Sequence, residues 1–191
     1  MRYTVKFRIW HWLNAIVIIT LLGTVFLRKT FLSWRVNAEI LSDKLLGMGI
    51  EITSMQAKTL AKAIRAEMWE WHIILGYALA FLTIYRIYLY FKDTSQKDSF
   101  RYLDTHKKMV FMLHWIFYIT IFFMSVSGFV IYFYEVFNLS KVMVHDIKEL
   151  HELAYNFFII FVPLHIIGVI VAENTKEHGI ISSMISGKYY G

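Results

Sequence analysis

The chain has 191 residues, of which 58% are apolar and 18% aromatic, with a formal net charge of +6 and a mean hydropathy of +0.50. This composition excludes an ordinary soluble domain and predicts an integral membrane protein. Cysteine is absent, which excludes a thiolate-ligated haem, an iron–sulfur cluster or a covalently attached haem built from this chain alone.

Four long apolar segments are separated by stretches in which the charged residues collect. Backbone amides in hydrocarbon need internal hydrogen-bond partners, so we expect each segment to be a helix. The predicted fold is all-α: a single domain over residues 1–191, built as a four-transmembrane-helix bundle. The predicted spans are residues 9–27, 69–91, 109–134 and 150–172.

Residues 28–68 form the long first loop, which we place on the outer side. From Ser54 its apolar residues recur at helical spacing with Lys58, Lys62 and Arg65 between them, which predicts an amphipathic helix running into the second span. This helix either lies on the membrane surface or lengthens the span. The alternative is a docking surface for a partner on the outer face.

The distribution of basic residues predicts the orientation. Residues 92–108 are rich in Lys and Arg, whereas residues 135–149 contain only Lys141 and Lys148 beside several acidic residues. By the positive-inside rule the second loop, residues 92–108, is cytoplasmic. With four spans, both termini then lie on the cytoplasmic side as well.

Histidines in three of the spans point to a cofactor. His151 and His165 are fourteen residues apart, so on a helix they share one face to within roughly 40° and lie about 21 Å apart along the axis. His11, in the first span, is expected at the depth of His165, and His72, in the second span, at the depth of His151. A single histidine near a membrane boundary is usually interfacial, but four at matched depths favour two bis-histidine, non-covalent haems of the b type. The expected pairs are His72 with His151, and His11 with His165.

Two further polar residues lie in the spans. Arg86 follows His72 by fourteen residues and would meet the depth of the other haem, where a haem propionate or a quinone headgroup would supply an anion. The competing interpretation is an arginine that reaches from the boundary toward water. His114, in the third span, could compete with His11 as a ligand, contact a propionate, or exchange protons with a quinone.

Four motifs resemble the prokaryotic cytochrome b561 family, whose relatives include the di-haem b subunits of membrane-bound nickel–iron hydrogenases and formate dehydrogenases. The resemblance covers the four spans and lies outside the first loop. The motifs are RIWHWLNA in the first span, HIILG followed by Arg86 in the second, LHW in the third and LHELAYNFFIIFVPLH in the fourth.

The resemblance implies that His11 and His165 hold a cytoplasmic-side haem, that His72 and His151 hold an outer one, and that electrons are exchanged with the quinone pool. Two imidazoles fill both axial positions of a haem, so we expect electron transfer and no catalytic residue in this chain.

The leading hypothesis is a subunit of the bacterial inner membrane that links a periplasmic oxidoreductase, similar to a hydrogenase or formate dehydrogenase, to quinone. The alternatives are a stand-alone quinone oxidoreductase acting on a small diffusible substrate, and a haem-free membrane anchor. We expect the lipid bilayer and redox proteins as partners, and no nucleic acid.

Overall fold

The computed structural model describes residues 3–92, 105–175 and 177–188. The fold is 85% helical, and no strand occurs in these ranges. The helices along the chain are α1 (Val5–Lys29), α2 (Trp34–Gly47), α3 (Ser54–Lys92), α4 (Thr105–Tyr132), α5 (Lys141–Thr175) and α6 (Ile180–Ile185).

Four of these helices, α1, α3, α4 and α5, are long and apolar enough to cross a membrane. The prediction of an all-α membrane protein with four membrane-spanning helices is therefore confirmed. The single-domain assignment stays a prediction: by its contacts the chain divides into two compact units, and the division passes through α1 after Ile16 and through α3 after Gly76.

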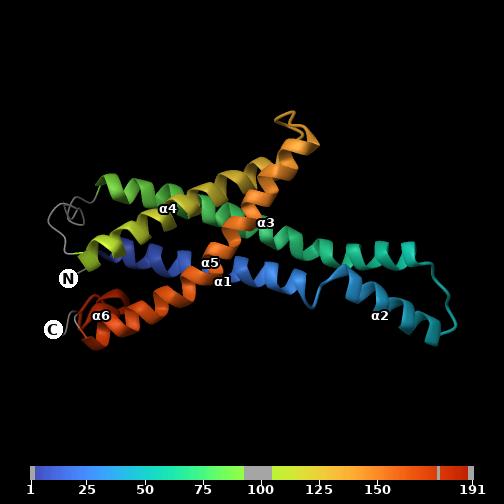
Figure 1. The fold of residues 1–191 in the computed structure, drawn as a ribbon, viewed down its shortest axis with the longest axis horizontal. Helices are drawn as coiled ribbons and strands as arrows, with labels where there is room; N and C mark the ends of the chain where they lie inside the picture. Colours follow the sequence, from blue (N-terminus) through green and yellow to red (C-terminus); the bar gives the residue numbers. More distant parts are fainter. Residues whose placement is uncertain (1–2, 93–104, 176, 189–191) are drawn as a thin grey trace. The chain divides into compact units, whose positions relative to one another are not determined.

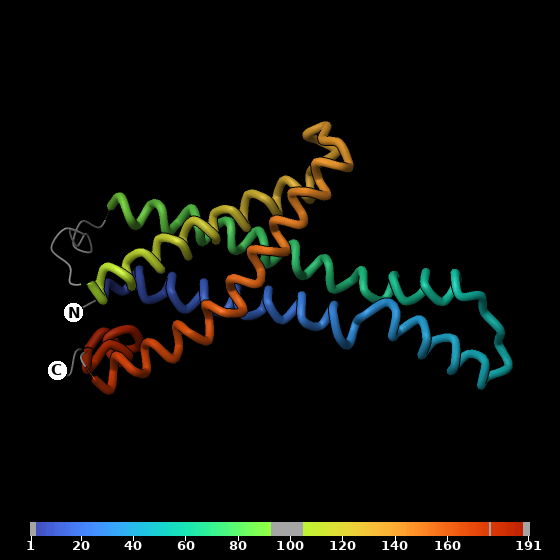
Figure 2. The backbone as a smooth tube through the Cα atoms, viewed as in Figure 1, coloured from blue at the N-terminus to red at the C-terminus, as the bar shows by residue number. Residues whose placement is uncertain are grey.

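Polar residues cap the starts of two helices: α3 begins at Ser54, where the sequence predicts an amphipathic helix, and α5 begins earlier than its predicted span. Thr53 and Gln56 form a reciprocal capping box, in which each backbone amide donates to the other side chain, and α3 then continues as one helix to Lys92 (Figure 2). The Ser140 hydroxyl accepts a hydrogen bond from the Met143 amide, so α5 begins at Lys141.

The larger unit, Met1–Ile16 with Tyr77–Gly191, contains α4 and α5, which pack against each other from the connection that joins them (Figure 1). Aromatic rings fill part of this contact: the Phe117 ring centre lies 4.7 Å from that of Phe161 and 5.8 Å from that of Phe158. On α1, Trp10 is buried and its indole N–H donates to the carbonyl of Leu82 at 2.8 Å. This bond fixes the first turns of α1 to α3.

The short helix α6 closes the end of the same unit. The carboxylate of Glu173 accepts hydrogen bonds from the amides of Gly179 and Ile181, each at 2.9 Å, which ties the turn before α6 to the end of α5. Arg8 donates to the carbonyl of Ile185 and covers Gly187, where a Cβ would lie 2.8 Å from the guanidinium. Gly187 has φ +78°, which disfavours a larger residue there, whereas the flexible Arg8 side chain could move aside.

The smaller unit, Val17–Gly76, contains α2, and the beginning of α3 runs back along it (Figure 2). The ammonium group of Lys58 lies 5.0 Å from the Trp34 ring centre. Both helices line a groove of about 400 Å³, and Ala57, one of its lining residues, is buried. The first loop is therefore mostly helical, and its helix α2 was not predicted from the sequence, although Trp34, Ala38, Leu41 and Leu45 recur at helical spacing.

Replacing Trp10 with Phe should lower the free energy of unfolding by about 1 kcal/mol, since it removes a buried hydrogen bond while keeping an aromatic ring. The measurement is unfolding in detergent micelles. Trp12→Phe is the control, because the Trp12 indole makes a longer, exposed bond of 3.4 Å to Met184. Equal losses in the two variants would contradict the role given to Trp10.

Candidate functional site

Three histidines from three helices meet in the larger unit. The ring centre of His165 on α5 lies 6.2 Å from that of His11 on α1 and 6.4 Å from that of His114 on α4. Phe161, one turn before His165, stacks on its ring at 5.7 Å with an angle of 12° between the planes. The His165 imidazole is thus held by a ring of its own helix and lies close to an imidazole from each of two other helices.

The separation of these rings suits a haem. An iron atom held between two imidazole nitrogens, with bonds of about 2 Å, places the two ring centres roughly 6 Å apart. Both pairs, His11 with His165 and His114 with His165, meet this requirement. Neutral imidazole is also the donor that b-type haem takes. The residues therefore fit the group, and the distances by themselves allow either pair.

No cluster of three or more His, Cys, Asp or Glu side chains that could hold a metal ion occurs in the ranges that the structure describes. Sites made entirely of protein ligands, such as a structural zinc site, need such clusters. A haem needs axial ligands in pairs, because the porphyrin supplies the other four nitrogens.

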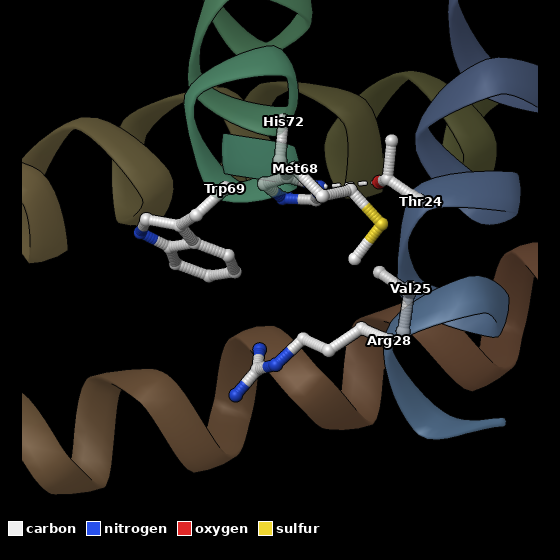
Figure 3. Close-up of a pocket in the computed structure, with 6 residues that line it drawn as sticks. All are labelled: Thr24, Val25, Arg28, Met68, Trp69 and His72. Carbon is white, nitrogen blue, oxygen red and sulfur yellow. Dashed lines mark hydrogen bonds between the residues drawn. The ribbon is translucent and has the colours of Figure 1, made fainter. Parts of the chain in front are cut away.

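His72 lies in the smaller unit, on α3. Its Nδ1 is 2.8 Å from the hydroxyl of Thr24 on α1, and its ring stacks on that of Trp69 at 5.1 Å with an angle of 6° (Figure 3). The Arg28 guanidinium lies 4.8 Å from the ring centre of Trp69. The imidazole is therefore held by a hydrogen bond on one side and by a ring contact on the other.

His151 lies in the larger unit, on α5, and its ring contacts a hydroxyl, as the ring of His72 does. Its Nδ1 is 2.8 Å from the hydroxyl of Ser127 on α4. A Cβ at Gly128 would lie 3.4 Å from Cε1 of the same ring, so a small residue at this position leaves room for the imidazole. The two predicted outer ligands, His72 and His151, thus have the same kind of bond to a buried hydroxyl.

Arg86 lies in an aromatic cage in the larger unit. Its Nε and Nη2 donate to the Tyr118 hydroxyl, both at 3.2 Å, and its guanidinium carbon lies 5.0, 5.4 and 5.0 Å from the ring centres of Phe7, Trp10 and Tyr118. No carboxylate of the described residues forms a salt bridge with it. Aromatic faces stabilise the cation, and no hydrogen bond from its Nη1 occurs within the described residues.

Sequence reasoning missed the two hydroxyl partners and the cage. Thr24 and Ser127 are 48 and 24 residues away from the histidines they contact, so no local spacing indicates either pair. The Trp69 stack had a local signal, because residues three apart on a helix share a face.

A family model described as prokaryotic cytochrome b561 matches residues 2–187, nearly the whole chain. No curated protein and no solved structure matches the chain.

Replacing Tyr118 with Phe should lower the free energy of unfolding by about 2 kcal/mol, because the Arg86 guanidinium loses its hydrogen-bond acceptor inside the bundle. The measurement is again unfolding in detergent micelles. Tyr85→Phe is the matched control, since the Tyr85 hydroxyl makes no hydrogen bond within the described residues. A Tyr118→Phe protein as stable as the control would show that Arg86 is satisfied by its ring contacts.

Proposed function

The chain belongs to the prokaryotic cytochrome b561 family, and on that premise we propose that it carries electrons between a periplasmic redox partner and the quinone pool. Family membership makes the protein a multi-pass membrane protein with b-type haem and a role in electron transport. The partner, the quinone and the ligand assignment are the proposal. The observation that carries it is the group of imidazoles around His165, within a chain that matches the family from residue 2 to residue 187.

Two haems are proposed, one on each side of the membrane. His11 and His165 would hold the cytoplasmic one, and His72 and His151 the outer one. The fourteen-residue interval on α5 and the 6.2 Å separation of the His11 and His165 rings support this assignment. When bound, such a haem supplies one-electron transfer at an iron whose two axial positions are both filled.

His114 and Arg86 are proposed to serve the quinone and the cytoplasmic haem. His114 lies beside His165 without being required as a ligand if His11 fills that role, so it can exchange a proton with a quinone headgroup. Arg86 presents unused donors on a cation held by three aromatic rings, which suits a propionate or a quinone oxygen.

The length of α3 supports a partner outside the membrane. Its 39 residues extend over about 58 Å, about twice the thickness of the hydrocarbon core. The part before the apolar segment carries charged residues and pairs with α2, and both expose apolar side chains: Val36 is 47% and Met55 67% exposed. Exposed apolar groups beside a groove are typical of a surface that binds another protein.

The proposed orientation places the α2–α3 hairpin on the periplasmic side of the inner membrane and both termini in the cytoplasm. The basic loop between α3 and α4 supports this, because cytoplasmic loops carry an excess of Lys and Arg. The residues of that loop, 93–104, lie outside the described ranges.

Family membership favours a haem protein over the haem-free anchor. The stand-alone quinone oxidoreductase is the second candidate. His114 on α4 and Arg86 on α3 interact electrostatically, and together they offer a proton donor and a cation to a quinone. Copurification separates the two: a stand-alone enzyme reduces or oxidises quinone without a second subunit.

The purified protein should contain two b-type haems per chain, and His72→Ala, His151→Ala, His11→Ala and His165→Ala should each leave one, since a haem with one axial imidazole is held weakly. The measurement is haem content against protein, with the reduced absorption spectrum. His145→Ala is the control, because that ring lies beside Asp146 and Glu149 on an exposed part of α5. Two haems remaining in all four variants would contradict the assignment.

Comparison of His11→Ala with His114→Ala decides which imidazole pairs with His165, because the two rings lie at nearly the same distance from it. We expect His11→Ala to lose a haem. We expect His114→Ala to keep both and to slow reduction by a soluble quinol about 100-fold, within the range for loss of a general acid–base group. Loss of a haem in His114→Ala, with retention in His11→Ala, would reverse the two roles.

A further inference from the structure

Two buried hydroxyls contact the predicted outer ligands in the same way. Thr24 is 8% and Ser127 is 4% exposed, and each hydroxyl oxygen lies 2.8 Å from Nδ1 of a histidine, His72 and His151 respectively. The two contacts occur in different units of the chain and on different pairs of helices. The same bond is therefore built twice from unrelated local sequences.

The protons in these contacts can be assigned. A hydroxyl has one proton, and Thr24 donates its proton to the carbonyl of Leu21 at 2.6 Å. The Ser127 hydroxyl likewise donates to the carbonyl of Phe123 at 2.6 Å. Each oxygen must then accept from the imidazole, so both neutral rings carry their proton on Nδ1 and have the lone pair on Nε2.

The other predicted pair lacks this arrangement. Neither His11 nor His165 forms a hydrogen bond within the described residues, and their ring contacts are with aromatic side chains and other imidazoles. The two ligand pairs are therefore chemically different, although all four ligands are histidines.

We infer that Thr24 and Ser127 are positioning residues that hold His72 and His151 with Nε2 toward the iron and lower the reduction potential of the haem these histidines bind. The inference rests on the proposed ligand assignment. A ligating imidazole that donates its other N–H to an acceptor is fixed in tautomer and orientation and becomes more basic. A more basic ligand stabilises the oxidised iron.

The setting strengthens the effect. Each hydroxyl is polarised by its own bond to a helix carbonyl, so it is a better acceptor for the imidazole N–H than an isolated hydroxyl. Both hydroxyls are shielded from water, and at His72 the Trp69 ring also restricts rotation of the imidazole. Each bond between hydroxyl and imidazole is therefore short and shielded from water, so solvent cannot take the place of the hydroxyl.

The experiment is a redox titration of the haem-loaded full chain carrying Thr24→Val or Ser127→Ala. Each variant removes one hydroxyl with little change of volume. Both should raise the potential of one and the same haem, the one that is lost in His151→Ala, and should weaken binding of that haem by at least about 10-fold. The potential of the second haem should not change.

Matched controls are available in the same bundle. Thr83 is 8% exposed like Thr24 and donates to its own helix at the carbonyl of Leu79, while Ser125 donates to the carbonyl of Ile121, and neither hydroxyl contacts a histidine. Thr83→Val and Ser125→Ala should leave both potentials unchanged. Thr24→Ser, which keeps a hydroxyl, should restore the original potential.

The outcomes separate the inference from the proposed function. Complete loss of the outer haem in Ser127→Ala, with retention in Ser125→Ala, supports the inference. Potentials in Thr24→Val and Ser127→Ala equal to those of the controls overturn it while leaving the ligand assignment intact. Retention of both haems in His151→Ala overturns the ligand assignment instead. In that case the ring nitrogen-15 chemical shifts of His151 in haem-free protein still report its tautomer. A proton found on Nε2 refutes the assignment of the proton to Nδ1.

Discussion

The structure depends on one constraint: inside a membrane, polar groups must find partners within the protein, because hydrocarbon offers none. The helical backbone satisfies most of them. The polar side chains in the spans follow the same rule: the hydroxyls of Thr24, Thr83 and Ser127 all donate to carbonyls of their own helices. Once these donors are used, the hydroxyl oxygens become acceptors, and the imidazoles of two histidines make use of them.

The same constraint explains the environment of the charged residue in the spans. Arg86 has no carboxylate partner among the described residues and is enclosed by the rings of Phe7, Trp10 and Tyr118. An aromatic cage stabilises a cation without neutralising it, so the guanidinium keeps its attraction for an anion. A structural salt bridge would have cancelled that charge. Caged arginine and clustered imidazoles together suit a site that holds an anionic cofactor and exchanges electrons and protons.

Sequence periodicity predicted the spanning helices well because the apolar length that crosses a membrane is a local property. Helix ends were predicted less well. The start of α5 depends on one hydroxyl, that of Ser140, which is a short signal inside a polar stretch. The start of α3 lies at Ser54, where the sequence predicts the beginning of an amphipathic helix. The helix α2 was missed within the first loop, although its apolar residues Trp34, Ala38, Leu41 and Leu45 recur at helical spacing.

The sequence by itself determined that the protein is a helical membrane protein and that α5 carries two imidazoles on one face, because both follow from composition and a regular helical repeat. The tertiary structure decided which side chains meet those imidazoles. The Ser127 and Thr24 contacts join residues 24 and 48 positions from their histidines, and the cluster at His165 brings in His114 as well as His11. Such contacts depend on how helices rotate and pack against one another, and the spacing of residues along one helix does not determine that.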